Sequence, residues 1–243
     1  MTGPHFICPT YFNQGRDFNR DACRRHCACE VDFISALVAG YQSDVRRNWE
    51  RCLDMKWSMQ DYVSGCHNVD EDAERIDRNG HQYRLYLENI NKLADYLNGK
   101  DNNYWEQFVN ADFEQLYDAL STEIRNHKGI GELSTYDTIL RLGWNYRKRI
   151  SPQAFVYLHA GAFEGAKALA RISELKRRKY IQLLPAQLIA WKKVGEVCKI
   201  DIRLFHRSLR LLDANHLENF LCVFHKPLEA YADFLEREKR NKQ

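Results

Sequence analysis

Residues 126–170 read NHKGIGELSTYDTILRLGWNYRKRISPQAFVYLHAGAFEGAKALA, with a glycine turn between two helical patterns. The turn is Lys128-Gly129-Ile130-Gly131. Ser121–Asn126 has the pattern of a helix end, and Glu132–Gly143 has the pattern of the next helix. One apolar stripe repeats along that second helix at helical spacing, and it consists of Leu133, Tyr136, Ile139, Leu140 and Trp144. Because the link is so short, the two helices are expected to pack as a hairpin.

The glycine turn has the chemistry of a phosphate site. Gly129 and Gly131 tolerate a positive φ and allow another backbone to approach closely. The start of the second helix presents N–H groups and a partial positive charge, which suit an anion. A plain corner between two helices of a bundle has the same sequence, so both interpretations stay open here.

At these residues the chain resembles the helix-hairpin-helix DNA glycosylase superfamily. The resemblance covers residues 126–170 and lies in the glycine turn, the helix after it, and Phe155–His159. It implies that Lys128, Gly129, Ile130 and Gly131 bind a DNA phosphate. It also implies excision of a base, possibly a modified one, by hydrolysis of the N-glycosidic bond. The aspartate that the family places two residues before its motif histidine falls here on Tyr157, which cannot serve as that carboxylate.

A base-excising enzyme therefore needs another acid. We expect Asp137 to be that acid, because it lies one turn into the hairpin helix, with Glu164 in reserve. His159 would orient the acid or polarise the leaving base, although a hydrogen-bonded core histidine has the same pattern. Without a lysine in a matched position, we expect a monofunctional enzyme. The extruded base would be stacked and read by a pocket made of His81, Gln82, Tyr136 and Tyr157.

Two basic segments are candidates for contacts with double-stranded DNA. They are Arg147-Lys148-Arg149 and Lys176-Arg177-Arg178, and Arg203, His206, Arg207 and Arg210 extend the second one. A solvated connector is the alternative for Arg147–Arg149. Two further functions stay open: a non-catalytic DNA-binding protein, which the tyrosine at 157 suits, and a structural helical protein.

The overall composition bounds the remaining choices. A net charge of +3 permits a polyanionic partner without requiring one. We find no run of about 18 apolar residues and no secretory signal, so we expect a cytoplasmic protein with reduced cysteines. Cys23, Cys27 and Cys29 have metal-ligand chemistry but lack a second distant pair, so we favour structural thiols over zinc. No motif indicates a cofactor.

The patterns predict an all-α or nearly all-α globular protein with several helices, including the helix-hairpin-helix element. Helices are expected over residues 31–66, Leu85–Leu97, Trp105–Ile124 and Ala214–Phe224, the last one capped by Asp213. The spacing of Gly161 and Gly165 places two small residues on one helical face and permits close packing. We expect an N-terminal helical region over residues 1–100 and a hairpin-containing region over 101–243, or one continuous domain.

Three segments, 80–84 (GHQYR), 129–169 and Leu217–Phe224, also resemble segments that recur together in bacterial and phage proteins. This second resemblance supplies no activity. A role in antiviral defence would be consistent with it.

Overall fold

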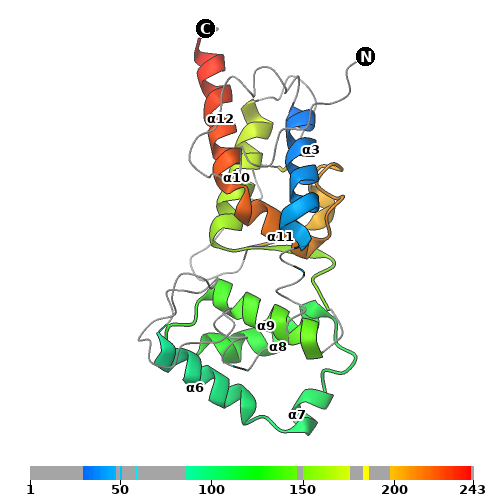
Figure 1. Cartoon of the computed structure of the whole chain (residues 1–243), viewed down its shortest axis with the longest axis vertical. Helices are drawn as coiled ribbons and strands as arrows, with labels where there is room; N and C mark the ends of the chain where they lie inside the picture. The colour runs from blue at the N-terminus through cyan, green and yellow to red at the C-terminus, as the bar shows by residue number, and fades with distance from the viewer. Residues whose placement is uncertain are drawn as a thin grey trace. The chain divides into compact units, whose positions relative to one another are not determined.

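The computed structural model describes residues 30–47, 50, 59, 86–146, 150–175, 183–185 and 198–241. These residues are mostly helical and include one pair of short strands, which confirms the prediction of a nearly all-α fold (Figure 1). The chain divides into two compact units. Unit 1 comprises Met1–Asn48 and Gln153–Gln243, and unit 2 comprises Trp49–Pro152. The boundary expected at residue 100 falls inside unit 2.

Unit 2 contains four described helices. They are α6 (Leu87–Asn98), α7 (Asn102–Glu106), α8 (Phe113–Arg125) and α9 (Glu132–Tyr146). The expected apolar stripe of α9 is confirmed at Tyr136, Ile139 and Leu140, which are fully buried. Helices α8 and α9 pack against each other as the hairpin prediction requires.

The single helix predicted over Trp105–Ile124 is wrong, because the chain breaks it between α7 and α8. Asp112 caps α8: its Oδ1 accepts from the Gln115 N–H at 2.8 Å, and Gln115 Oε1 accepts from the Asp112 N–H at 2.9 Å. This capping box satisfies exposed N–H groups at the start of a new helix. Asp101 caps α7 in the same way, through Tyr104.

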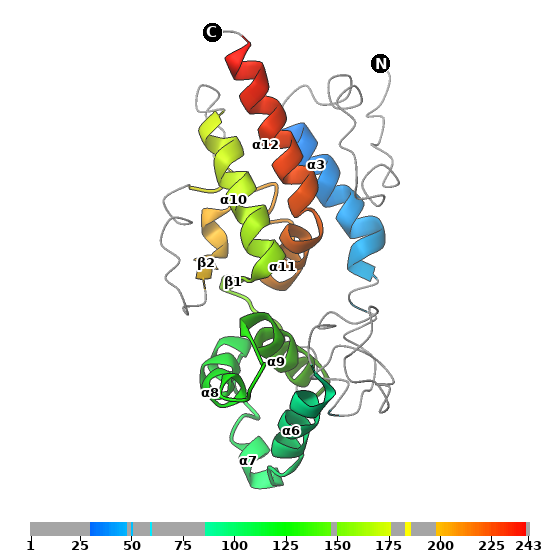
Figure 2. The same ribbon diagram turned by 90° about the vertical axis from the view of Figure 1, so that its left-hand side faces the viewer.

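Unit 1 contains four described α-helices and a two-stranded antiparallel sheet (Figure 2). The helices are α3 (Glu30–Gly40), which continues as a π-helical turn (Tyr41–Val45), α10 (Ala160–Leu175), α11 (Ala214–Val223) and α12 (His225–Arg240). Strand β1 (Phe155–Leu158) pairs with β2 (Cys198–Asp201), and a 3₁₀ turn (Ile202–Leu204) follows β2. Sequence patterning missed β2, because CKID is too short for alternation to be visible. The Asp213 cap is confirmed, since its Oδ1 accepts from the His216 N–H at 2.8 Å.

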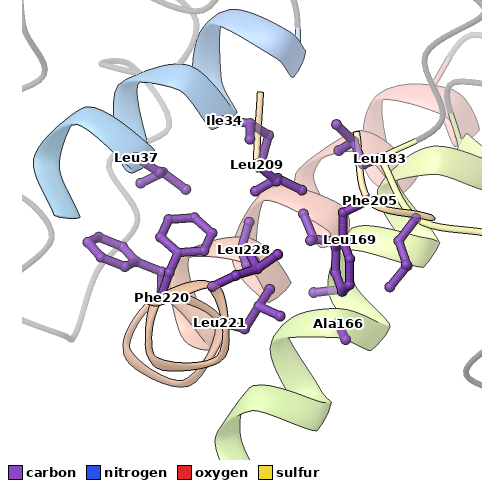
Figure 3. Close-up of a cluster of buried hydrophobic side chains, with 14 of the residues drawn as sticks. Ile34, Leu37, Ala166, Leu169, Leu183, Phe205, Leu209, Phe220, Leu221 and Leu228 are labelled. Carbon is purple, nitrogen blue, oxygen red and sulfur yellow. The ribbon is translucent and has the colours of Figure 1, made fainter. Parts of the chain in front are cut away.

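The core of unit 1 lies where α10 packs against α11 and α12. Figure 3 shows side chains from α3, α10, α11, α12 and the intervening segments converging there, including Ile34, Leu169, Phe205, Phe220 and Leu228. Burying each such side chain contributes roughly 1.5–3 kcal/mol.

The backbones of α10 and α11 are in contact at two glycines, which confirms the predicted close packing. A Cβ added at Gly165 would lie 2.3 Å from the carbonyl oxygen of Leu221, and one at Gly161 would lie 3.0 Å from Cys222 Sγ. Only a residue without a side chain permits this approach.

Within the described ranges, no helix is both long enough and apolar enough to cross a membrane. In the same ranges, His, Cys, Asp and Glu side chains do not gather in any group of three that could hold a metal ion.

Candidate nucleic-acid interface

The hairpin turn between α8 and α9 has a fixed conformation. Gly129 has φ +82°, in the left-handed region that favours glycine. Directly beside it lies Asn89 of α6, whose Nδ2 would be 2.6 Å from a Cβ at this position. The next residue, Ile130, is buried, and its N–H donates to the His127 carbonyl at 3.1 Å. The turn is therefore anchored by an apolar side chain and a supporting helix.

The residues on either side of Ile130 face solvent. Lys128, Gly129 and Gly131 are exposed, and a Cβ added at Gly131 would meet no atom within 4 Å. The Gly131 carbonyl accepts both the N–H and the Oγ1 hydroxyl of Thr135, each at 2.9 Å, which fixes the first turn of α9. The start of α9 is thus accessible beside a lysine, and helix starts attract anions.

A cluster of two tyrosines, a lysine and a glutamate supports the hairpin from α6 and α7. The Tyr96 and Tyr104 hydroxyls donate to Glu123 Oε2 at 2.7 and 3.0 Å. The Lys100 Nζ lies 4.2 and 4.3 Å from the centroids of the two tyrosine rings and 3.3 Å from Glu123 Oε2. We call these four residues the tyrosine–lysine cluster.

The tyrosine–lysine cluster reaches the hairpin through His127, whose ring lies 4.8 Å from the Tyr96 ring, centroid to centroid. The hydroxyl of Tyr96 is the main cause that lowers the pKa of the Glu123 carboxyl, and Tyr104 and Lys100 add to it. Burial lowers the pKa of His127. Both shifts favour, near neutral pH, a charged Glu123 and a neutral His127 next to the hairpin turn.

The expected catalytic acid of the hairpin helix is buried. Asp137 Oδ2 lies 3.3 Å from Arg141 NH2 one turn along α9, and both side chains are 2% exposed. Removing one member of a buried ion pair leaves a desolvated charge, which typically costs about 3–5 kcal/mol. This geometry gives Asp137 a structural task in holding Arg141. Tyr136, an expected base-pocket residue, is fully buried and packs edge-on against Phe113.

The remaining described candidates belong to unit 1. His159 and Tyr157 are both buried, and their rings stack with centroids 6.5 Å apart. The Lys199 ammonium lies over the Tyr157 ring, 5.4 Å from its centroid. Glu164 is half-buried and forms an ion pair with Lys167 at 2.8 Å. The structure therefore brings His159 and Tyr157 together and leaves Glu164 as the carboxylate that solvent reaches.

Several expected site residues lie outside the described residues. They are His81, Gln82, Arg147, Lys148, Arg149, Lys176, Arg177 and Arg178, together with Cys23, Cys27 and Cys29.

Sequence reasoning missed the tyrosine–lysine cluster. The sequence feature that could have indicated it is the spacing of Tyr96, Lys100 and Tyr104 at i, i+4 and i+8. The predicted helix ended at Leu97, so the three residues were not considered together. It also missed a buried polar face on α11, where Asn215, His216, Glu218 and Asn219 are each at most 4% exposed. The apolar stripe of α11 was predicted, but the polar residues between were not expected to be covered.

Comparison of the chain with protein-family models, with curated proteins and with solved structures gives no match. The helix-hairpin-helix resemblance therefore rests on the sequence of residues 126–170 alone.

Proposed function

We propose that this protein binds double-stranded DNA through the hairpin turn at Lys128–Gly131, without excising a base. The accessible backbone at Gly131 carries this proposal. Ile130 and Asn89 hold the turn from beneath, while open space surrounds Gly131 at the start of α9. A phosphate oxygen fits there because backbone N–H groups and a helix start together favour an anion.

Lys128 adds one positive charge to this site. Its charge also contributes, after the larger effects of the hydrogen bond and charge of Lys92, to lowering the pKa of Glu88. A lysine that contacts one phosphate releases about one counterion on binding, so DNA affinity should fall with rising salt. Contacts of this type position a protein on DNA without reading its sequence.

Base excision fits the described geometry less well. A flipped base needs an accessible aromatic ring and an acid that can reach it. Tyr136, Tyr157 and Asp137 are all covered, and the position of the family's aspartate is occupied by Tyr157. The covered positions of these residues favour binding without chemistry, whereas Glu164 is accessible to solvent. Base excision therefore stays a prediction that the second test addresses.

The first test measures duplex binding by fluorescence anisotropy. Gly131→Ala places a methyl group on the proposed phosphate site without touching another atom of the protein. We expect the Kd to rise about tenfold, as for loss of a charged hydrogen bond. Gly40→Ala is the matched control, since a Cβ there also meets nothing within 4 Å. Equal binding by Gly131→Ala and wild type, or no binding by wild type at low salt, would overturn the proposal.

The second test measures base release from duplexes carrying normal, damaged and modified bases, scored by alkaline cleavage at abasic sites. We expect none from the wild-type protein. Release that disappears in Glu164→Gln or His159→Asn would replace the proposal with base excision. Asp137→Asn is less informative, because it deprives the buried Arg141 of this carboxylate and lowers stability, so its unfolding must be measured alongside.

A further inference from the structure

The turn between the 3₁₀ helix and α11 presents two arginines on a rigid backbone. Phe205 and Leu209 are buried beneath it. The His206 N–H donates to the Leu183 carbonyl at 2.9 Å, and the His206 carbonyl accepts from the N–H groups of Leu209 and Arg210 at 2.8 and 3.2 Å. Arg207 and Arg210 are exposed on this turn. Their Cα positions are therefore fixed by packing from below.

The imidazole of His206 adds a third donor. Its Nδ1 accepts from the Ser208 N–H at 3.3 Å and lies 3.0 Å from Ser208 Oγ. Because Nδ1 is an acceptor, the proton of the neutral ring is on Nε2. Burial lowers the pKa of His206 most, and the charges of Arg207 and Arg210 lower it further. The bond from the Arg210 N–H to the His206 carbonyl places residues 206, 207 and 210 within one turn of the backbone, with both arginines exposed.

Arg203 does not belong to this surface. Its Nε lies 3.0 Å from both carboxylate oxygens of Asp201, and its NH2 also bonds Oδ2. The side-chain hydrogen bond from Arg203 is the main reason that the pKa of Asp201 is lowered to about 2. Arg207 and Arg210, by contrast, make no ion pair with any residue in the part of the chain that the structure describes.

We infer that His206, Arg207 and Arg210 form a second nucleic-acid contact, which binds phosphodiester groups of the DNA backbone. This inference rests on the proposed function. Guanidinium groups match phosphate oxygens in two-point geometry, and the Nε2–H of His206 is a further donor on the same turn. Leu204 and Leu211 are also exposed, at 44% and 67%. Two separate leucines offer little apolar area for insertion into a lipid surface, which depends on that area, so the charged donors favour nucleic acid.

The test compares three probes at several salt concentrations: a DNA duplex, inorganic polyphosphate, and vesicles containing phosphatidylserine. The variant is Arg207→Gln with Arg210→Gln. The matched control is Lys226→Gln with Lys239→Gln, which removes the same charge from two exposed sites of unit 1. Gly131→Ala reports the hairpin separately.

We expect the double arginine variant to weaken duplex and polyphosphate binding about tenfold and to reduce the salt slope for duplex by about 2. The lysine control should lose far less affinity for both probes, and Gly131→Ala should weaken duplex binding through the hairpin. Equal losses of duplex affinity in the arginine and lysine variants would overturn the inference. The proposed function would still stand if Gly131→Ala weakened duplex binding. Wild-type binding to polyphosphate or vesicles without duplex binding would overturn both.

Discussion

The two units carry opposite charge. Unit 1 contains 23 Lys and Arg residues against 15 Asp and Glu, whereas unit 2 contains 13 against 18. The hairpin turn therefore lies in the acidic unit, and the Arg207–Arg210 surface lies in the basic unit. Long-range attraction of a polyanion depends on the summed charge, while a hairpin contact depends on local N–H geometry. For the DNA binding proposed above, this difference predicts that the charge of unit 1 governs long-range attraction and that the hairpin of unit 2 makes a local contact.

Two polar networks that contain tyrosine hydroxyls, one in each unit, differ in how deeply they are buried. In unit 1 the Tyr41 hydroxyl donates to Asn219 Oδ1 at 3.1 Å and lies 2.9 Å from His216 Nδ1, and all three residues are buried. Because the single hydroxyl proton goes to Asn219, the His216 proton must be on Nδ1. In unit 2 the tyrosine–lysine cluster is only partly buried. Buried networks are more costly to break than solvated ones.

The largest effect in unit 1 is expected where α10 contacts α11. Gly165→Ala drives a methyl group into the Leu221 backbone, which cannot move aside as a flexible side chain does. We expect a loss of about 3 kcal/mol in the free energy of unfolding, measured with urea. Gly40→Ala, which meets open space, should be neutral or stabilising by less than about 1 kcal/mol. A loss in Gly165→Ala no larger than in Gly40→Ala would contradict the close packing of unit 1.

The buried network of unit 1 should show the next largest effect. Tyr41→Phe removes the hydroxyl between His216 and Asn219 while keeping the ring edge against Phe220. We expect a loss of about 2 kcal/mol in unfolding free energy, because buried polar atoms lose a partner. Tyr104→Phe in unit 2 is the comparison, and it should lower the unfolding free energy by less than half as much. Equal losses of unfolding free energy would contradict the distinction between the buried and the solvated network.

Gly129→Ala should have a smaller effect that is confined to unit 2. A non-glycine residue at φ +82° costs about 1 to 2 kcal/mol. The new methyl group also meets the end of the Asn89 side chain. Adding Asn89→Ala should recover the share of the lost unfolding free energy that comes from the clash with Asn89, and leave the share that comes from the positive φ. A double-mutant cycle in urea measures the two shares. Full recovery would mean that the turn tolerates the backbone conformation without glycine.

The sequence predicted those features that local patterns determine. The apolar stripe of α9 followed from helical periodicity, the Asp213 cap from its side-chain chemistry, and the contact at Gly165 from glycine spacing on one face. The break at Asp112 was also readable, since Asp112 and Gln115 form a capping box, but the aromatic residues from Trp105 to Tyr117 suggested one continuous helix.

Features that depend on distant partners could not be predicted in this way. The burial of Asp137 depends on how α9 packs, and the link from Tyr41 to His216 joins residues 175 positions apart. In the sequence, Arg203 looks equivalent to Arg207 and Arg210, but in the structure its side chain is hydrogen-bonded to Asp201. Charge at a position was therefore visible, but its availability to a ligand was not.

The smallest effect concerns the pH dependence of unit 2. Glu123→Gln removes the negative charge of the carboxylate that accepts hydrogen bonds from two tyrosine hydroxyls beside Lys100. Because this side chain is 39% exposed, we expect a loss below about 1 kcal/mol in the free energy of unfolding near neutral pH. The folded protein lowers the pKa of this carboxyl, chiefly through Tyr96. Its stabilisation is therefore present above the ordinary glutamate pKa and lost as the pH falls through the lowered one. The difference between wild type and Glu123→Gln in thermal unfolding should shrink as the pH falls below the ordinary glutamate pKa of about 4.5. A difference that stays constant across this range would show that the hydroxyls bind the side chain without depending on its charge, and the cluster would then resemble the uncharged network of unit 1.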